Sequence, residues 1–228
     1  MHLIVVVYDN YLQATAHSNT YYRRQTMKIM AFLGSPRKGS NTDLLIDQVI
    51  EGAKSAAAVE VEKVYIYDAD IKYCTGCGAH SILQGSKDCP LKDDMAGILQ
   101  RMQEADGFIF GSPNHGRTIS AGLTNFFSRM MPLLKMHVER DDAGNIVHAE
   151  ARPLIRGKKA VIVVSQGDNI ASSSALVLMI LDANLRDFHL RKVGEVFSTF
   201  NLKRAQVKEK PADLKTAFAA GVRLATAR

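Results

Sequence analysis

The sequence predicts an α/β fold, in which helices cover both faces of a doubly wound parallel sheet of five strands in the order 2-1-3-4-5. Between residues 27 and 228, short apolar runs alternate with longer stretches of helical periodicity. The run Ala160–Val164 is apolar at every position, which is typical of a strand covered on both faces. A loop rich in glycine and hydroxyl residues follows the first run. In such sheets, ligands bind at the carboxyl ends of the strands.

The first strand and the first helix are the clearest of these elements. The apolar run Ile29–Leu33 stops at Gly34, and a helical pattern begins with Leu44 and continues with Val49 and Ile50. Taken in order along the chain, the strands are expected at residues 28–33, 60–67, 107–112, 159–165 and 192–199. The helices are expected at residues 42–58, 94–105, 120–133, 171–188 and 211–226.

Two of these helices carry residues suited to their first turns. Asp93 or Asp94 can cap the helix at 94–105, and the cluster Ser172–Ser174 lies near the start of the helix at 171–188. Carboxylate and hydroxyl side chains accept hydrogen bonds from the unpaired N–H groups of a first turn.

Two regions lie outside this pattern, so we divide the chain into an extension at residues 1–26 and a domain at residues 27–228. For the extension, an extra strand, a tail and an upstream start site remain open, because Met27 is a second plausible start. Residues 134–158 form an insertion, in which the turn signal Asp141–Asn145 separates Met136–Val138 from Ile146–Val147. We expect a β-hairpin there, suited to cross a dimer partner.

The loop after the first strand has the composition of a phosphate site. It offers hydroxyl groups, an amide and a guanidinium group within nine residues, from Ser35, Arg37, Ser40, Asn41 and Thr42. The start of a helix adds free N–H groups and the positive end of the helix dipole. No Gly-Lys-Ser/Thr ends the loop, and Gly-x-Gly-x-x-Gly is missing, which excludes the usual nucleotide loops. The loop therefore predicts a phosphorylated cofactor.

Three loops together resemble one known family. Gly34–Thr42 resembles the FMN loop Gly-Ser-x-Arg-x-x-Ser-Asn-Thr of the flavodoxin-like NAD(P)H-dependent FMN reductases. Ser112–Gly116 and the helix pattern Gly122–Arg129 resemble the second loop of that family and the helix after it. Ser165–Asp168 resembles the third loop, and all of these segments stand in the family's order. The resemblance implies a flavodoxin-like fold.

The resemblance also implies where FMN binds. In the family, the second loop surrounds the flavin ring and offers it backbone N–H groups, which need the close approach that Gly and Pro allow. Carried over, the cofactor-binding residues are Ser35, Arg37, Ser40, Asn41, Thr42, Pro113, Asn114, His115, Gly116, Ser165 and Gly167. His115 is also the candidate catalytic residue, since an imidazole can protonate a substrate that is being reduced. A polar loop residue without a proton role is the alternative.

All three cysteines lie in one segment. Cys74, Cys77 and Cys89 resemble three positions of the cysteine loop in the iron–sulfur flavoprotein branch of the family, and His80 stands at the fourth. A [4Fe–4S] cluster generally takes four thiolates, whereas Cys₃His is also a structural zinc set. Three alternatives therefore remain open for this segment: the absence of any metal, an iron–sulfur cluster, and zinc or a redox thiol role. The absence of a metal is the favoured one.

Composition limits the other classes of function. The hydrophobic share of 46% is enough for a full core, and no apolar run approaches the ~20 residues of a membrane span. An odd number of cysteines does not suggest a disulfide framework, so the reducing cytoplasm is the expected location. The net charge of +6 suits anionic cofactors. A nucleic-acid partner is not expected, because the only dense basic run, at residues 203–210, is interpreted as a solvated loop.

The resemblance therefore predicts an FMN-dependent oxidoreductase. It would pass electrons from NAD(P)H through FMN to a quinone, a flavin or another small acceptor, and it would work as a homodimer or homotetramer. An iron–sulfur flavoprotein that carries electrons between protein partners is the alternative. A nucleic-acid-binding protein without a flavin is a third, weaker hypothesis, and it would show steeply salt-dependent affinity.

Overall fold

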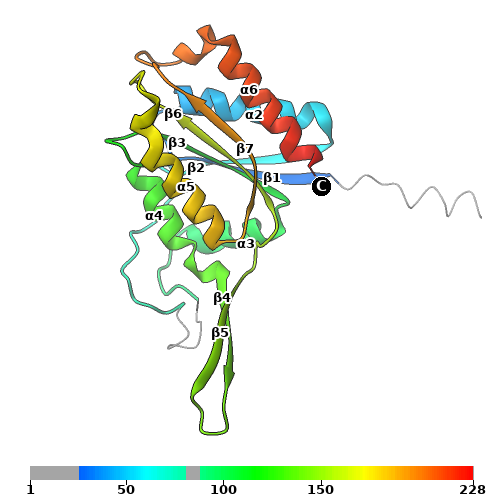
Figure 1. The fold of residues 1–228 in the computed structure, drawn as a ribbon, viewed down its shortest axis with the longest axis vertical. Helices are drawn as coiled ribbons and strands as arrows, with labels where there is room; N and C mark the ends of the chain where they lie inside the picture. The colour runs from blue at the N-terminus through cyan, green and yellow to red at the C-terminus, as the bar shows by residue number, and fades with distance from the viewer. Residues whose placement is uncertain (1–25, 81–87, 228) are drawn as a thin grey trace, which may run out of the picture.

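The computed structural model describes residues 26–80 and 88–227 of the chain. Its main sheet contains five parallel strands in the order β2-β1-β3-β6-β7 (Figure 1). The strands are β1 (Met27–Leu33), β2 (Val59–Tyr65), β3 (Gly107–Pro113), β6 (Lys159–Ser165) and β7 (Arg191–Ser198). Counted along the parallel strands alone, this is the predicted order 2-1-3-4-5. The predicted α/β fold class is confirmed.

Helices cover both faces of the sheet (Figure 1). One face carries α2 (Asn41–Ala56) and α6 (Pro211–Thr226), and the other carries α3 (Met95–Glu104), α4 (Ala121–Arg129) and α5 (Ala175–Asp187). Alternate residues of β1 belong to different cores, with Phe32 facing α4 and Ala31 and Leu33 facing α2. This alternation explains why the central strands are apolar throughout.

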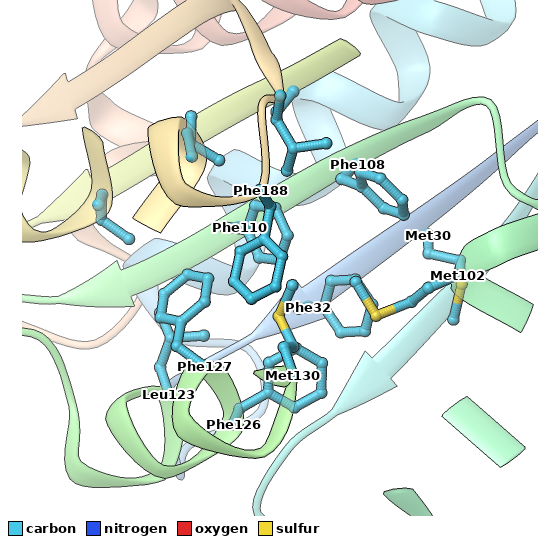
Figure 2. Packing of buried hydrophobic residues seen from close by; sticks show 14 of the residues in the cluster. Met30, Phe32, Met102, Phe108, Phe110, Leu123, Phe126, Phe127, Met130 and Phe188 are labelled. Carbon is cyan, nitrogen blue, oxygen red and sulfur yellow. The ribbon is translucent and has the colours of Figure 1, made fainter. Parts of the chain in front are cut away.

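An aromatic cluster holds α4 beneath the centre of the sheet (Figure 2). The ring of Phe32 on β1 lies 5.2 Å from that of Phe110 on β3 and 4.7 Å from that of Phe126 on α4. Phe127 on α4 contacts Phe110 in turn, at 5.3 Å between ring centres. Such aromatic contacts add to the stabilisation from burial. Because α4 follows β3 closely, this packing fixes the loop between them.

The helix boundaries differ from the prediction at two places. The predicted helix at 120–133 breaks after Arg129 into the 3₁₀ turn η2 (Met131–Leu133), whose second residue, Pro132, has no N–H to donate. The predicted helix at 171–188 begins with the 3₁₀ turn η3 (Ala171–Ser174). Ser174 stands at the N-cap of α5 but does not cap it, because its hydroxyl group binds the Gln166 side chain instead.

The insertion forms the predicted β-hairpin. Strands β4 (Leu134–Arg140) and β5 (Ile146–Pro153) pair antiparallel, and the Asp141 carboxylate closes the turn by accepting the Ala143 and Asn145 N–H groups. The hairpin extends away from the main sheet as an arm (Figure 1).

Two observations complete the fold. The 3₁₀ turn η4 (Gln206–Glu209) leads into α6, while the extension at residues 1–25 lies outside the described residues. None of the helices in the described ranges is long and apolar enough to cross a membrane.

Candidate functional site

A cavity of about 80 Å³ opens where the loops after β1, β3 and β6 meet, at the carboxyl ends of these strands. Its lining residues are Ser35, Arg37, Ser40, Asn41, Thr42, Pro113, Asn114, His115, Ser165, Gln166, Gly167 and Asn201. Ten of the eleven residues predicted to bind a cofactor are among them, and Gly116 is not. Segments more than a hundred residues apart in the sequence thus form one site.

The N-terminus of α2 forms one wall of this cavity. Ser40 is its N-cap, and the hydroxyl group accepts the Asp43 N–H at 3.4 Å. The same hydroxyl donates to Ser35 Oγ at 3.1 Å, and Ser35 Oγ accepts the Arg37 N–H at 3.2 Å. These bonds fold the loop tightly against the start of the helix. The positive end of the helix dipole therefore faces the cavity, which is the arrangement of an anion site.

The loops after β1 and β3 approach each other closely at Gly34. Its N–H donates to the Gly111 carbonyl at 2.8 Å, and a Cβ at Gly34 would lie only 2.8 Å from that oxygen. A larger residue would therefore push the two loops apart. A hydroxyl pair, Thr42 Oγ1 and Ser165 Oγ at 2.7 Å, joins α2 to the end of β6 in the same way.

Gln166 organises the loops after β3 and β6. Its side chain is 4% exposed, and its carbonyl oxygen accepts the Asn114 Nδ2 at 3.0 Å. Its Nε2 donates to the carbonyls of Asp168 and Ile170, at 3.1 and 2.9 Å. The Asn114 amide nitrogen therefore joins the loop after β3 to the loop after β6. Gln166 lies within the third motif loop, but the motif predicted no role for it. A polar residue directly after a buried strand is the signal that could have indicated its role.

The loop after β7 forms a further wall that the sequence did not predict. The Asn41 amide holds this loop, donating to the Lys203 carbonyl and accepting the Val207 N–H, both at 2.9 Å. Asn41 thus lines the cavity with its side chain already bound at both ends. Asn201 lines the cavity from the same loop, and no motif in the sequence points to it.

The basic run at 203–210 is more than the solvated loop that we predicted. The Arg204 guanidinium group lies against Gly39 and donates to the Lys38 carbonyl of the phosphate loop. The Lys210 ammonium group donates to the Phe200 carbonyl at 3.0 Å. Arg204 is exposed and Lys210 is half-buried, and both hold the loop after β7 in place beside the site.

The two cations of the phosphate loop face different ways. Arg37 lines the cavity, whereas Lys38 turns to the Asp68 carboxylate at 2.5 Å and lies 4.7 Å from the centre of the Tyr65 ring. The hydrogen bond to Asp68 raises the pKa of Lys38 above its ordinary value. Arg37 is therefore the cation of this loop that lines the cavity.

A tight turn carries His115 at the edge of the cavity. The backbone groups of His115 and Thr118 bond each other at 3.0 and 3.3 Å, and both residues between them, Gly116 and Arg117, have positive φ angles of 61° and 68°. The His115 side chain is exposed at this edge. Gly116 allows the turn but does not line the cavity.

The cysteine segment lies at a second, separate cavity. Cys74, Cys77, His80 and Cys89 all line this space of about 30 Å³, beside α4 and η2. Within residues 26–80 and 88–227, however, no group of three or more His, Cys, Asp or Glu side chains is placed to hold a metal ion. The donor set therefore shares a cavity but, as it stands, does not fit a metal or a cluster.

A buried ion pair anchors this segment. Arg129 binds the Asp93 carboxylate through both terminal nitrogens, at 2.6 and 3.0 Å, and also donates to the Lys72 carbonyl at 2.6 Å. Burial acts to raise the pKa of Asp93, but hydrogen bonds from Arg129 and from the Lys72 and Met95 N–H groups outweigh it and hold that pKa below its ordinary value. Arg129 and Asp93 thus join α4 to the start of α3.

Residues 27–187 match the family model described as NADPH-dependent FMN reductase. The chain belongs to this family. The match includes all three loops of the cavity that the sequence motifs indicated, and it confirms the resemblance. The loop after β7, with Asn201, lies beyond the matched residues.

The chain is also similar to curated iron–sulfur flavoproteins. One from Archaeoglobus fulgidus is 36% identical over 106 residues, which cover 46% of each chain. One from Methanosarcina thermophila is 35% identical over 107 residues, covering 47% of this chain and 54% of that protein. The chain therefore spans about half the length of these curated relatives.

Solved structures share the fold at low sequence identity. A NAD(P)H:quinone oxidoreductase from Methanothermobacter marburgensis has a TM-score of 0.64 at 18% identity, covering 88% of this chain and all of that one. An FMN-dependent NADH-azoreductase from Bacillus anthracis, solved with FMN, has a TM-score of 0.62 at 14% identity, covering 89% of this chain and all of that one. At this identity the likeness shows the flavodoxin-like fold alone.

Proposed function

We propose that this chain is an FMN-dependent oxidoreductase that takes electrons from NAD(P)H and passes them to a quinone, a flavin or another small acceptor. One observation carries the proposal. Ten residues drawn from three family motifs line one cavity at the carboxyl end of the sheet, where ligands bind in folds of this kind. Membership in the NADPH-dependent FMN reductase family supports the same assignment.

The cavity residues fit FMN at its phosphate end. Hydroxyl groups, a guanidinium group and a helix N-terminus converge there, and these are the groups that hold a phosphate. Ser35, Arg37, Ser40 and Thr42 would bind the phosphate, together with the backbone at Asn41. The cavity is too small for a three-ring flavin, so the ring would lie outside it, along Pro113, Asn114 and His115. Ser165 and Gly167 would line the chain between the two ends.

When bound, FMN would supply the redox chemistry, accepting a hydride from the nicotinamide and passing electrons on. The protein residues would orient the cofactor and leave one face of the ring open to each substrate in turn. His115, exposed at the cavity edge, would give a proton to the reduced acceptor and regain it from water. Gly116 would contribute through the turn that it permits rather than through contact.

FMN uptake and the phosphate contact can be tested together. We expect the purified chain to bind FMN and the bound flavin to bleach on anaerobic addition of NADH or NADPH. Arg37→Ala should weaken FMN binding about tenfold to a hundredfold, because it removes a charged contact to the phosphate. Lys38→Ala is the matched control, since it removes the same charge from the same loop but not from the cavity. A chain that takes up no FMN, or equal affinities in both variants, would refute the assignment.

A second candidate function is an iron–sulfur flavoprotein that carries electrons between proteins. It is favoured by the shared cavity of Cys74, Cys77, His80 and Cys89 and by the similarity to curated iron–sulfur flavoproteins. It would require these donors to move together, because the described residues contain no ready metal site. Iron and zinc analysis of anaerobically purified wild type and Cys77→Ser decides this. Metal that is present in wild type and absent from the variant supports this function. If neither protein contains iron or zinc, this function is ruled out.

We also propose that the chain forms a homodimer or homotetramer through the hairpin arm. One face of the arm is apolar and stands away from the main sheet, so a second copy that offers the same face would cover it.

A further inference from the structure

One residue of the cavity wall carries a side-chain acceptor that receives no hydrogen bond from the described part of the chain. Asn201 lines the cavity and is 9% exposed as a whole residue, and its Oδ1 atom is buried with no hydrogen-bond partner among the residues that the structure describes. A buried acceptor without a donor costs about 1–3 kcal/mol. Native proteins keep few such groups, and each calls for a reason.

The orientation of this amide is fixed by its other end. Asn201 Nδ2 donates to the Ser198 carbonyl at 3.0 Å and to Ser198 Oγ at 2.8 Å. A carbonyl can only accept, so the nitrogen must face Ser198. Ser198 Oγ gives its own proton to Asp213 Oδ2 at 2.5 Å and is therefore an acceptor for Asn201 as well. Oδ1 is thereby held away from Ser198.

The missing partner must be a donor. A phosphate dianion has no proton to donate, so the phosphate cannot be the hydrogen-bond partner of Oδ1. The donors that suit an anion, Arg37 and the start of α2, lie on other parts of the cavity wall, while Asn201 adjoins Gly167 through its own backbone. A hydroxyl group on the chain that follows a phosphate would supply the proton that Oδ1 lacks.

We propose that Asn201 Oδ1 accepts a hydrogen bond from a hydroxyl group of the ligand, so that the site selects a phosphate ester of a polyhydroxylated chain. This inference rests on the proposed function, because the ribityl phosphate of FMN is such a group. It adds a specificity-determining residue from the loop after β7, outside the three motif loops and outside residues 27–187.

The test removes the ligand hydroxyl and the protein acceptor separately. FMN and its 2′-, 3′- and 4′-deoxy analogues are titrated into wild type and Asn201→Ala, with fluorescence quenching as the readout. In wild type, one analogue should bind about fivefold to thirtyfold more weakly than FMN. In Asn201→Ala, the same analogue and FMN should bind equally. Ser198→Ala is the control, because it keeps Oδ1 and should keep the wild-type ratio.

The outcomes separate this inference from the proposed function. Wild type that takes up no FMN overturns both. Wild type that binds FMN and all three analogues equally overturns the role of Asn201 alone, as does a penalty that persists unchanged in Asn201→Ala. Asn201→Leu, which fills a similar volume without an acceptor, serves as a second variant if the alanine variant unfolds.

Discussion

At the scale of single residues, the most consequential pair outside the cavity is Arg129 with Asp93. Both side chains are almost fully buried, at 2% and 0% exposure. Each is held by several hydrogen bonds, and Asp93 Oδ1 also accepts the first N–H of α3, from Met95, at 3.1 Å. Removing one partner of a buried pair leaves the other charge without compensation.

We therefore expect Asp93→Asn to destabilise the fold in a pH-dependent way. Above the ordinary carboxyl pKa of 3.8 the lowered pKa of Asp93 contributes stability, and that contribution disappears as the pH falls through the lower value in the folded state. The variant has nothing to titrate at this position. The loss should be about 3–5 kcal/mol near pH 7 and should shrink below about pH 4. Urea unfolding at pH 7, 5 and 3 measures it.

The exposed neighbour provides the comparison. Asp94→Asn changes the same charge in the same turn, but the Asp94 carboxylate is exposed and accepts the Asp70 N–H at 2.9 Å. Its effect should be small at every pH. A stability difference between wild type and Asp93→Asn that stays constant from pH 7 to pH 3 would contradict the expectation.

Some residues of the candidate site could be predicted from the sequence, and others could not. Ser35, Arg37 and Ser40 stand in one contiguous motif, so their order alone identified them. Gln166 and Asn201 owe their roles to partners that only the fold brings near. An amide in a loop carries no periodicity or spacing that would reveal such a role, which is why sequence reasoning missed both.

At the scale of elements, α2 and α6 pack with their backbones in close contact. A Cβ at Gly221 on α6 would lie 1.8 Å from the Val49 carbonyl oxygen, and a Cβ at Gly52 on α2 would lie 2.0 Å from the Phe218 carbonyl oxygen. Each glycine thus faces the backbone of the other helix. Because α2 begins at the cavity, this packing also fixes the N-terminus that lines it.

We expect Gly221→Ala to destabilise the protein, although alanine favours helices. The clash is with backbone, which cannot rotate away, and such overpacking costs about 1–3 kcal/mol or more. The gain in helix propensity returns at most about 1 kcal/mol. Gly97→Ala in α3 is the matched control, since its Cβ would meet only the flexible Arg101 side chain at 3.3 Å. Thermal unfolding should show opposite signs for the two variants, and equal shifts would disprove the close contact.

The elements themselves were largely predictable, because their signals are local. Apolar runs located β1 and β6, shorter strand-like segments located the other three strands of the main sheet, and the turn signal Asp141–Asn145 located the hairpin. The misplaced helix starts and ends have specific causes. Pro132 follows α4 too closely for the helix to continue. The Ser174 hydroxyl group donates to Gln166, which lies eight residues earlier in the loop after β6.

At the scale of the whole molecule, the arm formed by β4 and β5 extends away from the main sheet (Figure 1). Its register sets Met136 opposite Ala151 and Val138 opposite Ala149, so one face of the arm is apolar. The other face is charged, with His137 between Lys135 and Glu139. A two-stranded hairpin is by itself marginally stable in water, and its open edges invite pairing with another chain.

We expect wild type to have two or four times the monomer mass by light scattering at micromolar concentration. Val138→Lys places a charge on the apolar face and should shift the protein toward the monomer, because an unpaired charge buried between copies is costly. His137→Lys is the matched control, since it puts the same side chain one residue away on the polar face. In a closed assembly of identical copies the interfaces are related by symmetry, so one substitution changes every interface at once. A monomeric wild type, or an unchanged mass for Val138→Lys, would show that the arm does not join copies of this chain.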